Sequence, residues 1–117
     1  MNGYRIKQNN NQWYFELFPS NNHSQAMGRS MDYTSFDECK KAIIKFKDFV
    51  ENNKLNFPVE NKLVKKTESG RYVFQYIESN ITIFWRTIPY GVKKNCYKGI
   101  ESIYKNIDEY TTNYLED

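Results

Sequence analysis

The sequence has few of the residues that build a catalytic or metal site. Its 117 residues include one histidine, two cysteines, three prolines and five glycines, none of which are adjacent. A structural zinc site needs about four clustered ligands, and a phosphate-binding loop needs closely spaced glycines. His23 lies in a polar segment and has no counterpart elsewhere in the chain. We therefore expect no metal site, no cofactor and no catalytic residues.

Long apolar runs are also absent. The first fifteen residues contain no such run, so we expect neither a secretory signal nor a membrane span. We therefore expect a cytoplasmic protein. In that compartment Cys39 and Cys96 are expected to be reduced core residues rather than a disulfide. The net charge of +3 and the pI of 8.8 are mild, whereas a nucleic-acid module more often has a pI above about 9.

Aromatic residues, in contrast, are abundant. The chain has ten Tyr, eight Phe and two Trp. Each buried ring removes roughly 150–250 Å² from water. A chain of this length can therefore form one well-packed domain without disulfides.

The second half of the chain repeats the first. Five of the residues from Arg29 to Val50 recur as the same residue type 57 positions later: Arg29, Tyr33, Cys39, Lys41 and Ile43 match Arg86, Tyr90, Cys96, Lys98 and Ile100. Upstream the offset is 59 and pairs Trp13 with Tyr72 and Phe15 with Phe74. The repeat predicts a single domain over residues 1–117, made of repeats at 4–53 and 60–108, a connector at 54–59 and a tail at 109–117.

Local patterns predict the elements of the first repeat. Residues 4–7 and 12–18 alternate around an Asn-rich turn and indicate a hairpin, and a third strand is expected at 24–30. Ser35 and Glu38 form a capping box, which predicts a helix that ends near residues 51–53. Its apolar stripe consists of Phe36, Cys39, Ile43, Phe46 and Val50.

The second repeat shows the same order. Strands are expected at 62–66, 71–77 and 81–88, and a helix is expected after Pro89 and Gly91. The stripe of this helix consists of Cys96, Ile100, Ile103 and Ile107.

With this βββα order present twice, the chain resembles the YegP-like family of small bacterial proteins over roughly residues 4–50 and 62–107. The matching residues are Phe15, Leu17, Ser30, Tyr33, Cys39, Ala42 and Ile43 in one unit, and Phe74, Tyr76, Thr87, Tyr90, Cys96, Gly99 and Ile100 in the other. The Asn-Gly turn of that family is replaced by residues 20–23 and 79–81. The resemblance implies an α+β fold of tandem units with pseudo-twofold symmetry, in which two main helices pack on one shared, mostly antiparallel sheet. It implies an unassigned function and no active site.

The repeated Arg-Ser/Thr-x-x-Tyr element is the first candidate binding site. Arg29 with Tyr33, and Arg86 with Tyr90, would set guanidinium groups beside phenols at two strand ends. Such groups suit a carboxylate, phosphate or nucleobase, and Arg71 is expected to support them. In the structural alternative, the Ser or Thr bonds the strand-to-helix backbone and the tyrosine packs over the helix start. We favour the structural alternative for Ser30, Thr87 and both tyrosines, and leave Arg29 and Arg86 open.

The outward positions of two strands are the second candidate. They hold Tyr14, Glu16 and Phe18 in one repeat and Val73, Gln75 and Ile77 in the other. An open sheet face is usually more polar, so we expect that either a partner or second copy covers it, or the tails of the chain lie on it.

These features together predict a non-catalytic cytoplasmic binding module that contacts another protein. A homodimer through the outer sheet face would be one form of that contact. The protein is not expected to bind a membrane. Two alternatives stay open: nucleic-acid binding through basic and aromatic side chains, and a small-molecule enzyme or sensor with a pocket at the repeat interface.

Overall fold

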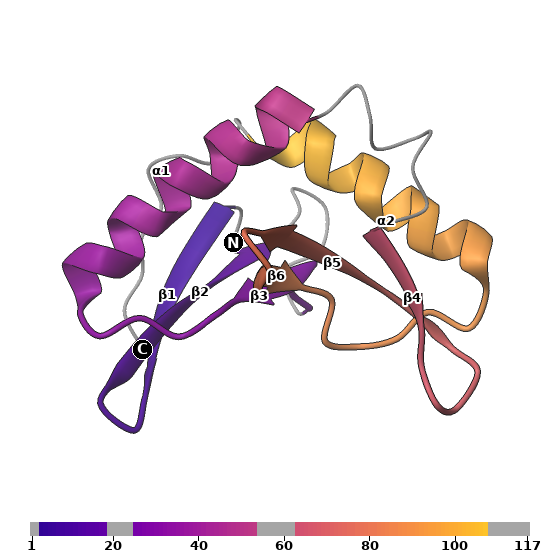
Figure 1. Ribbon diagram of the computed structural model, residues 1–117, viewed down its shortest axis with the longest axis horizontal. Coiled ribbons are helices and arrows are strands. Elements are labelled where there is room, and N and C mark those ends of the chain that lie inside the picture. The colour runs from indigo at the N-terminus through magenta and orange to yellow at the C-terminus, as the bar shows by residue number, and fades with distance from the viewer. Residues whose placement is uncertain (1–2, 19–24, 54–62, 108–117) are drawn as a thin grey trace.

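The fold consists of one open antiparallel sheet with two helices on one of its faces (Figure 1). The computed structural model describes residues 3–18, 25–53 and 63–107. The elements follow in the order β1 (Gly3–Asn9), β2 (Gln12–Phe18), β3 (Gly28–Ser30), α1 (Phe36–Asn53), β4 (Val64–Lys66), β5 (Tyr72–Glu78), β6 (Ile81–Trp85) and α2 (Lys93–Asn106). The predicted α+β class, shared sheet and two helices are confirmed. The predicted connector and tail lie outside the described residues.

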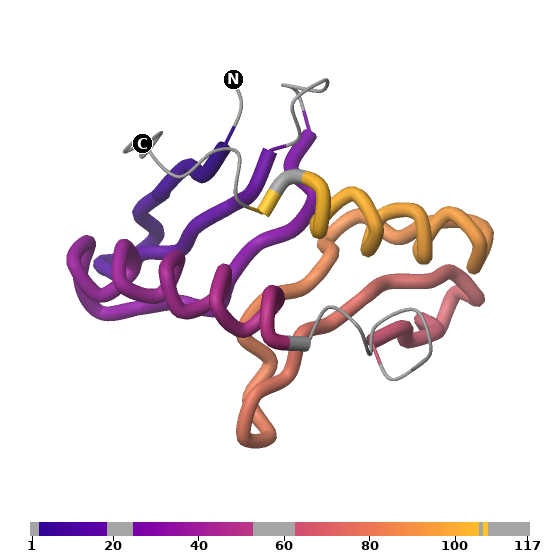
Figure 2. The backbone as a smooth tube through the Cα atoms, turned by 90° about the horizontal axis from the view of Figure 1, so that it is seen from above, coloured from indigo at the N-terminus to yellow at the C-terminus, as the bar shows by residue number. Residues whose placement is uncertain are grey.

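The two halves of the chain meet in the middle of the sheet. Its strand order is β1-β2-β3-β6-β5-β4, so the third strand of each half pairs with the other, Arg29 opposite Trp85 and Ser30 opposite Phe84. Each helix runs from an outer end of the molecule toward its centre (Figures 1 and 2). Each half thus contributes three strands and a helix in the same order. The pseudo-twofold symmetry stays a prediction.

Two tight turns set the hairpin registers. Asn10 and Asn11 between β1 and β2 have φ values of 52° and 66°, and Ser79 and Asn80 between β5 and β6 have 51° and 66°. Positive φ at both central residues matches the twist of a two-residue hairpin, and Asn tolerates this conformation better than most residues. The predicted turns at these two places are confirmed, whereas residues 19–24 lie outside the described part of the chain.

The two helices begin differently. In α1 the Oγ of Ser35 accepts a hydrogen bond from the N–H of Glu38 at 3.1 Å, which confirms the predicted cap. The Glu38 carboxylate reaches back to the N–H of Thr34 at 3.3 Å, one residue earlier than a capping box would place it. α2 starts after Val92 without a side-chain cap. Among the described residues, neither helix is long and apolar enough to cross a membrane.

Two strand boundaries differ from the sequence prediction. β3 spans three residues, because only Gly28 to Ser30 pair with the neighbouring strands. β6 ends at Trp85 rather than at residue 88. The Arg86 N–H still donates to the Phe74 carbonyl at 3.1 Å, and after Arg86 the chain turns away from the sheet. Thr87 and Ile88 are exposed, and the Ile88 carbonyl accepts a bond from the Arg86 side chain at 2.7 Å. The chain returns at Tyr90, which bridges to Tyr72.

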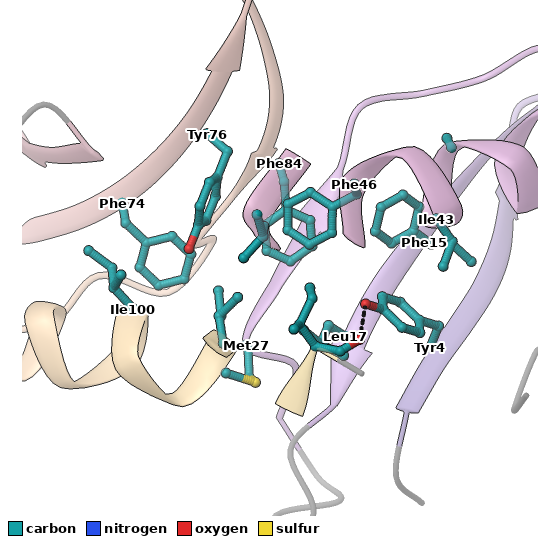
Figure 3. Packing of buried hydrophobic residues seen from close by; sticks show 14 of the residues in the cluster. Tyr4, Phe15, Leu17, Met27, Ile43, Phe46, Phe74, Tyr76, Phe84 and Ile100 are labelled. Carbon is teal, nitrogen blue, oxygen red and sulfur yellow. Dashed lines mark hydrogen bonds between the residues drawn. The ribbon is translucent and has the colours of Figure 1, made fainter. Parts of the chain in front are cut away.

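One aromatic cluster joins the halves beneath the helices (Figure 3). The ring of Phe46 on α1 stacks on Phe84 of β6 with centroids 4.4 Å apart and meets Tyr76 of β5 edge-on at 5.4 Å. Phe15 of β2 lies 5.8 Å from the rings of both Phe46 and Phe84. The predicted helix stripes are buried around this cluster, with only Phe36 partly exposed. A helix of the first half therefore depends on strands of the second.

Candidate functional site

The sheet face opposite the helices is called the outer face here. Register and alternation place on it Arg5, Lys7, Tyr14, Glu16, Phe18, Arg29, Lys65, Val73, Gln75, Ile77 and Trp85. In the described residues no helix lies on this face (Figure 1). The side chains that alternate with these, such as Phe15, Leu17 and Phe74, are buried under the helices. The sequence assignment of the two faces is therefore correct.

Arg29 lies at the centre of the outer face. Its guanidinium carbon is 3.9 Å from the centroid of the Tyr14 ring and 5.0 Å from that of Trp85. Its Nε donates to the Ser30 carbonyl at 2.8 Å, and its Nη2 donates to the Asp32 carboxylate at 2.6 Å. Stacking and ion pairing together hold the side chain in one orientation. Arg29 thus joins the aromatic side chains of the two halves into one rigid patch.

A depression of about 240 Å³ lies beside this patch. Its lining includes Arg5, Lys7, Glu16, Phe18 and Ile88. Nζ of Lys7 pairs with the Glu16 carboxylate at 2.9 Å, and the Arg5 guanidinium covers the Phe18 ring at 4.7 Å. Phe18 is therefore buried although it points away from the helices, a departure from the open apolar strip that the sequence predicts. Ile88 at the rim keeps 49% of its surface exposed.

Arg86 has different surroundings from Arg29. Its side chain donates to the main-chain carbonyls of Ile88 at 2.7 Å, Ala26 at 3.2 Å and Met27 at 3.3 Å. Its guanidinium also lies 4.3 Å from the Tyr90 ring. These bonds tie the segment before β3 to the loop after β6. The geometry is that of a structural link between the two halves.

The strand register explains why the two arginines differ. β2 pairs Glu16 with Arg29, whereas β5 pairs Gln75 with Trp85. Glu16 and Gln75 match at the upstream offset of 59, so the structural counterpart of Arg29 is Trp85. Arg86 lies one residue further along. The sequence repeat therefore does not produce two matched guanidinium sites.

The tyrosines of the repeated element make equivalent backbone bridges. Tyr33 exchanges two main-chain hydrogen bonds with Trp13, and Tyr90 does so with Tyr72. The side chain of Tyr33 lines a second pocket, of about 490 Å³, between α1 and the β5–β6 hairpin. Burial, with Cys39 and Glu78 nearby, raises the pKa of Tyr33 to about 12. The phenol is thus a neutral hydrogen-bond donor near neutral pH.

The remaining candidates are scattered. Arg71 is exposed in the β4–β5 turn, where its main-chain N–H donates to the Thr67 hydroxyl at 3.0 Å. The five proposed binding residues therefore do not converge: Arg29 belongs to the outer face, Tyr33 to the larger pocket and Arg86 with Tyr90 to the link between halves. Cys39 and Cys96 are free and buried, as expected. His23 lies outside the described residues.

Sequence reasoning missed the residues that complete both sites. Trp85 joins the outer-face patch only because β3 and β6 pair. Lys41 and Lys45 line the larger pocket opposite Glu78, and the sequence explains both lysines equally well as a solvated helix surface. The nearest signal is the small-molecule alternative, which requires a pocket at the repeat interface. The larger pocket lies between α1 of the first half and the β5–β6 hairpin of the second, and a ligand for it stays a proposal.

Known structures share the fold. No protein-family model and no curated protein matches the chain. The solution structure of YegP from E. coli, a protein of unknown function, matches with a TM-score of 0.73 at 20% identity over 98% of this chain and 91% of that one. A UPF0339 protein from Shewanella oneidensis matches with a TM-score of 0.65 at 20% identity over 97% and 89%. The resemblance to the YegP-like family is confirmed at the level of the fold, and these neighbours supply no catalytic assignment.

Proposed function

We propose that the protein is a non-catalytic cytoplasmic binding module whose outer face docks onto another protein. The observation that carries the proposal is the rigid patch of Arg29, Tyr14 and Trp85 on a helix-free face. Protein interfaces are enriched in Tyr, Trp and Arg, and their strongest contacts centre on such fixed anchors. The depression of about 240 Å³ next to the patch can receive a side chain of the partner.

The charges of the outer face favour a protein over a nucleic acid. Nucleic-acid binding depends on cations that are available to phosphates. Here Lys7 is paired with Glu16 and Arg29 with Asp32, which reduces their attraction for a polyanion. On the outer face as a whole, which also holds Arg5 and Lys65, basic residues nonetheless outnumber acidic ones, so a partner with acidic groups is favoured. The partner surface that fits is an apolar ridge bordered by carboxylates.

The titrating groups support a role without catalysis. General acids and bases work best with a pKa near the operating pH. Burial raises the pKa of Tyr33 and of Cys39 to about 12 and that of Cys96 to about 11. These shifts move the groups away from neutrality, as expected of side chains that serve packing.

The experiment compares two exposed isoleucines. Ile88 lines the depression on the outer face and is 49% exposed, whereas Ile44 lies on α1 and is 56% exposed. A partner is captured from nuclease-treated extract of the native cell and purified, and its affinity for wild type, Ile88→Asp and Ile44→Asp is measured by calorimetry. Ile88→Asp should weaken binding by about tenfold or more, because a charge replaces a buried apolar contact, and Ile44→Asp should leave it unchanged.

Three results would overturn the proposal. Equal losses in both variants would place the interface elsewhere. Binding that disappears on nuclease treatment and falls steeply with salt would select the nucleic-acid alternative. The third result is that sedimentation shows the wild type to self-associate, that only Ile88→Asp loses this association, and that no other partner is captured. That result would assign the face to a homodimer.

A further inference from the structure

The larger pocket lies on the helix side of the sheet, away from the outer face. Its volume of about 490 Å³ falls within the range of small-molecule sites, roughly 300–1,000 Å³. One wall is α1 and the other is the β5–β6 hairpin, which extends beyond the body of the molecule beside that helix (Figure 2). Apolar side chains line it, of which Ile81 and Ile83 are accessible and Phe15 and Phe46 are almost fully buried. The volume is large enough for a small planar apolar group.

The α1 wall adds two cations to this lining. Lys41 and Lys45 are one helical turn apart, and both are exposed. Within the described part of the chain neither has an ion-pair partner. Glu38 on the same wall keeps its negative charge while its carboxylate caps the helix through Thr34, so this wall carries two cations and one anion. Since neither lysine is paired, both are available to an anion in the pocket.

The other polar groups of the pocket set its orientation. Tyr33 contributes a neutral phenol whose O–H can donate to a ligand oxygen. Glu78 stands on the hairpin wall and repels a carboxylate placed near it. A ligand anion is thus directed toward Lys41 and Lys45 and away from the hairpin wall.

A difference between the halves accounts for open space at Tyr33. In the second half, a Cβ added to Gly99 would lie 2.9 Å from Cζ of Tyr90, so that tyrosine packs directly on the backbone of α2. The matching helix position in the first half is Ala42, whose methyl group keeps Tyr33 from packing in the same way. Both Ala42 and Tyr33 line the pocket instead.

We propose that this pocket binds a small organic carboxylate with a planar apolar body, the carboxylate facing Lys41 and Lys45 and the body lying against Ile81 and Ile83. The site uses a different surface from the proposed protein-docking face. The failure of either proposal therefore leaves the other standing.

The test uses a matched pair of probes, naphthoate and the uncharged naphthamide, titrated into the protein and followed by NMR shift changes and calorimetry. Naphthoate should bind about tenfold more tightly, since a charge-assisted contact is worth about that factor. Its shift changes should centre on Tyr33, Ala42 and Ile83. Lys41→Gln with Lys45→Gln should remove the preference, and Glu78→Gln should strengthen naphthoate binding about twofold or more by removing a repulsion.

The control is Lys94→Gln with Lys98→Gln. These lysines have the same spacing on α2, are equally exposed and change the net charge by the same amount. This variant should keep the preference for naphthoate. Equal affinity for the two probes, equal losses in both lysine variants, no binding, or shift changes away from the pocket would overturn the proposal. Circular dichroism verifies that each variant is folded.

Discussion

Tyr33 and Tyr90 make the same backbone bridges in the two halves of the protein, yet their side chains meet different surroundings. Tyr90 packs on Gly99 and lies under Arg86, whereas Tyr33 borders an open pocket. The helices differ as well, since α1 has a side-chain cap and α2 has none. Repetition in the sequence thus preserves the backbone bridges, while a single difference, Ala42 in place of Gly99, changes what surrounds the tyrosine side chain.

The prediction with the largest expected effect compares the contributions of the two helices to the stability of the core. Ile43→Ala and Ile100→Ala should each lower the free energy of unfolding by about 2–5 kcal/mol, because both side chains are buried beneath their helices. Urea denaturation monitored by circular dichroism measures both. The two costs should be comparable, and a neutral result at one position would mean that its helix contributes little to the shared core.

The second prediction separates the two arginines. Arg86→Ala should cost about 2 kcal/mol, because three main-chain carbonyls lose a charged donor. Arg29→Ala should cost less, about 1 kcal/mol, because it loses one main-chain bond, to Ser30, and its ion pair with Asp32 is partly exposed. The same denaturation experiment compares them, with Arg86→Lys as a control that keeps the charge but not the planar fork. Equal costs would contradict the different roles assigned here.

The third prediction concerns Gly99. In an exposed helix interior, Gly→Ala usually stabilises by about 1 kcal/mol. Here the added methyl would press on Tyr90, so we expect Gly99→Ala to destabilise the protein by about 1 kcal/mol instead. In a Tyr90→Leu background the sign should reverse. A stabilising effect in the wild-type background would show that Tyr90 moves aside without cost.

The smallest effect distinguishes the two thiols. Burial raises the pKa of Cys39 from its ordinary value of 9.0 to about 12. Burial also raises the pKa of Cys96, but the nearby Arg86 guanidinium partly offsets this rise, so that its value is about 11. Both thiols favour the folded state fully below pH about 9, and this contribution is lost as the pH rises toward their folded-state pKa values. Stability should therefore fall in alkali.

Iodoacetamide labelling of single-cysteine variants measures the difference between these thiols. Because the Arg86 guanidinium lowers the pKa of Cys96, Cys96 should react faster than Cys39 in mild alkali while the protein stays folded. Equal rates in the two variants would mean that opening of the fold, rather than ionisation, limits the reaction.

The sequence was informative where structure depends on neighbouring residues. Helix stripes such as Ile43 and Ile100, the Ser35 cap and the Asn10–Asn11 turn depend on short spacings, and all were predicted correctly. The sites were not, because their members come from distant segments: Arg29 needs Trp85 across the central strand pair, and Tyr33 faces the β5–β6 hairpin. The strand pairing also places Trp85, not Arg86, at the position equivalent to Arg29. An alignment of the two repeats does not reveal this shift of one residue.

The central pairing of β3 with β6 also has a consequence during protein synthesis. β1, β2, β3 and α1 emerge from the ribosome before β6 exists, so one edge of β3 stays unpaired until the second half is made. Unpaired strand edges promote aggregation, and short or charged strands reduce that hazard. β3 has only three residues, and Arg29 is at its centre. Both features reduce the hazard of wrong pairing at this edge while the second half is being made.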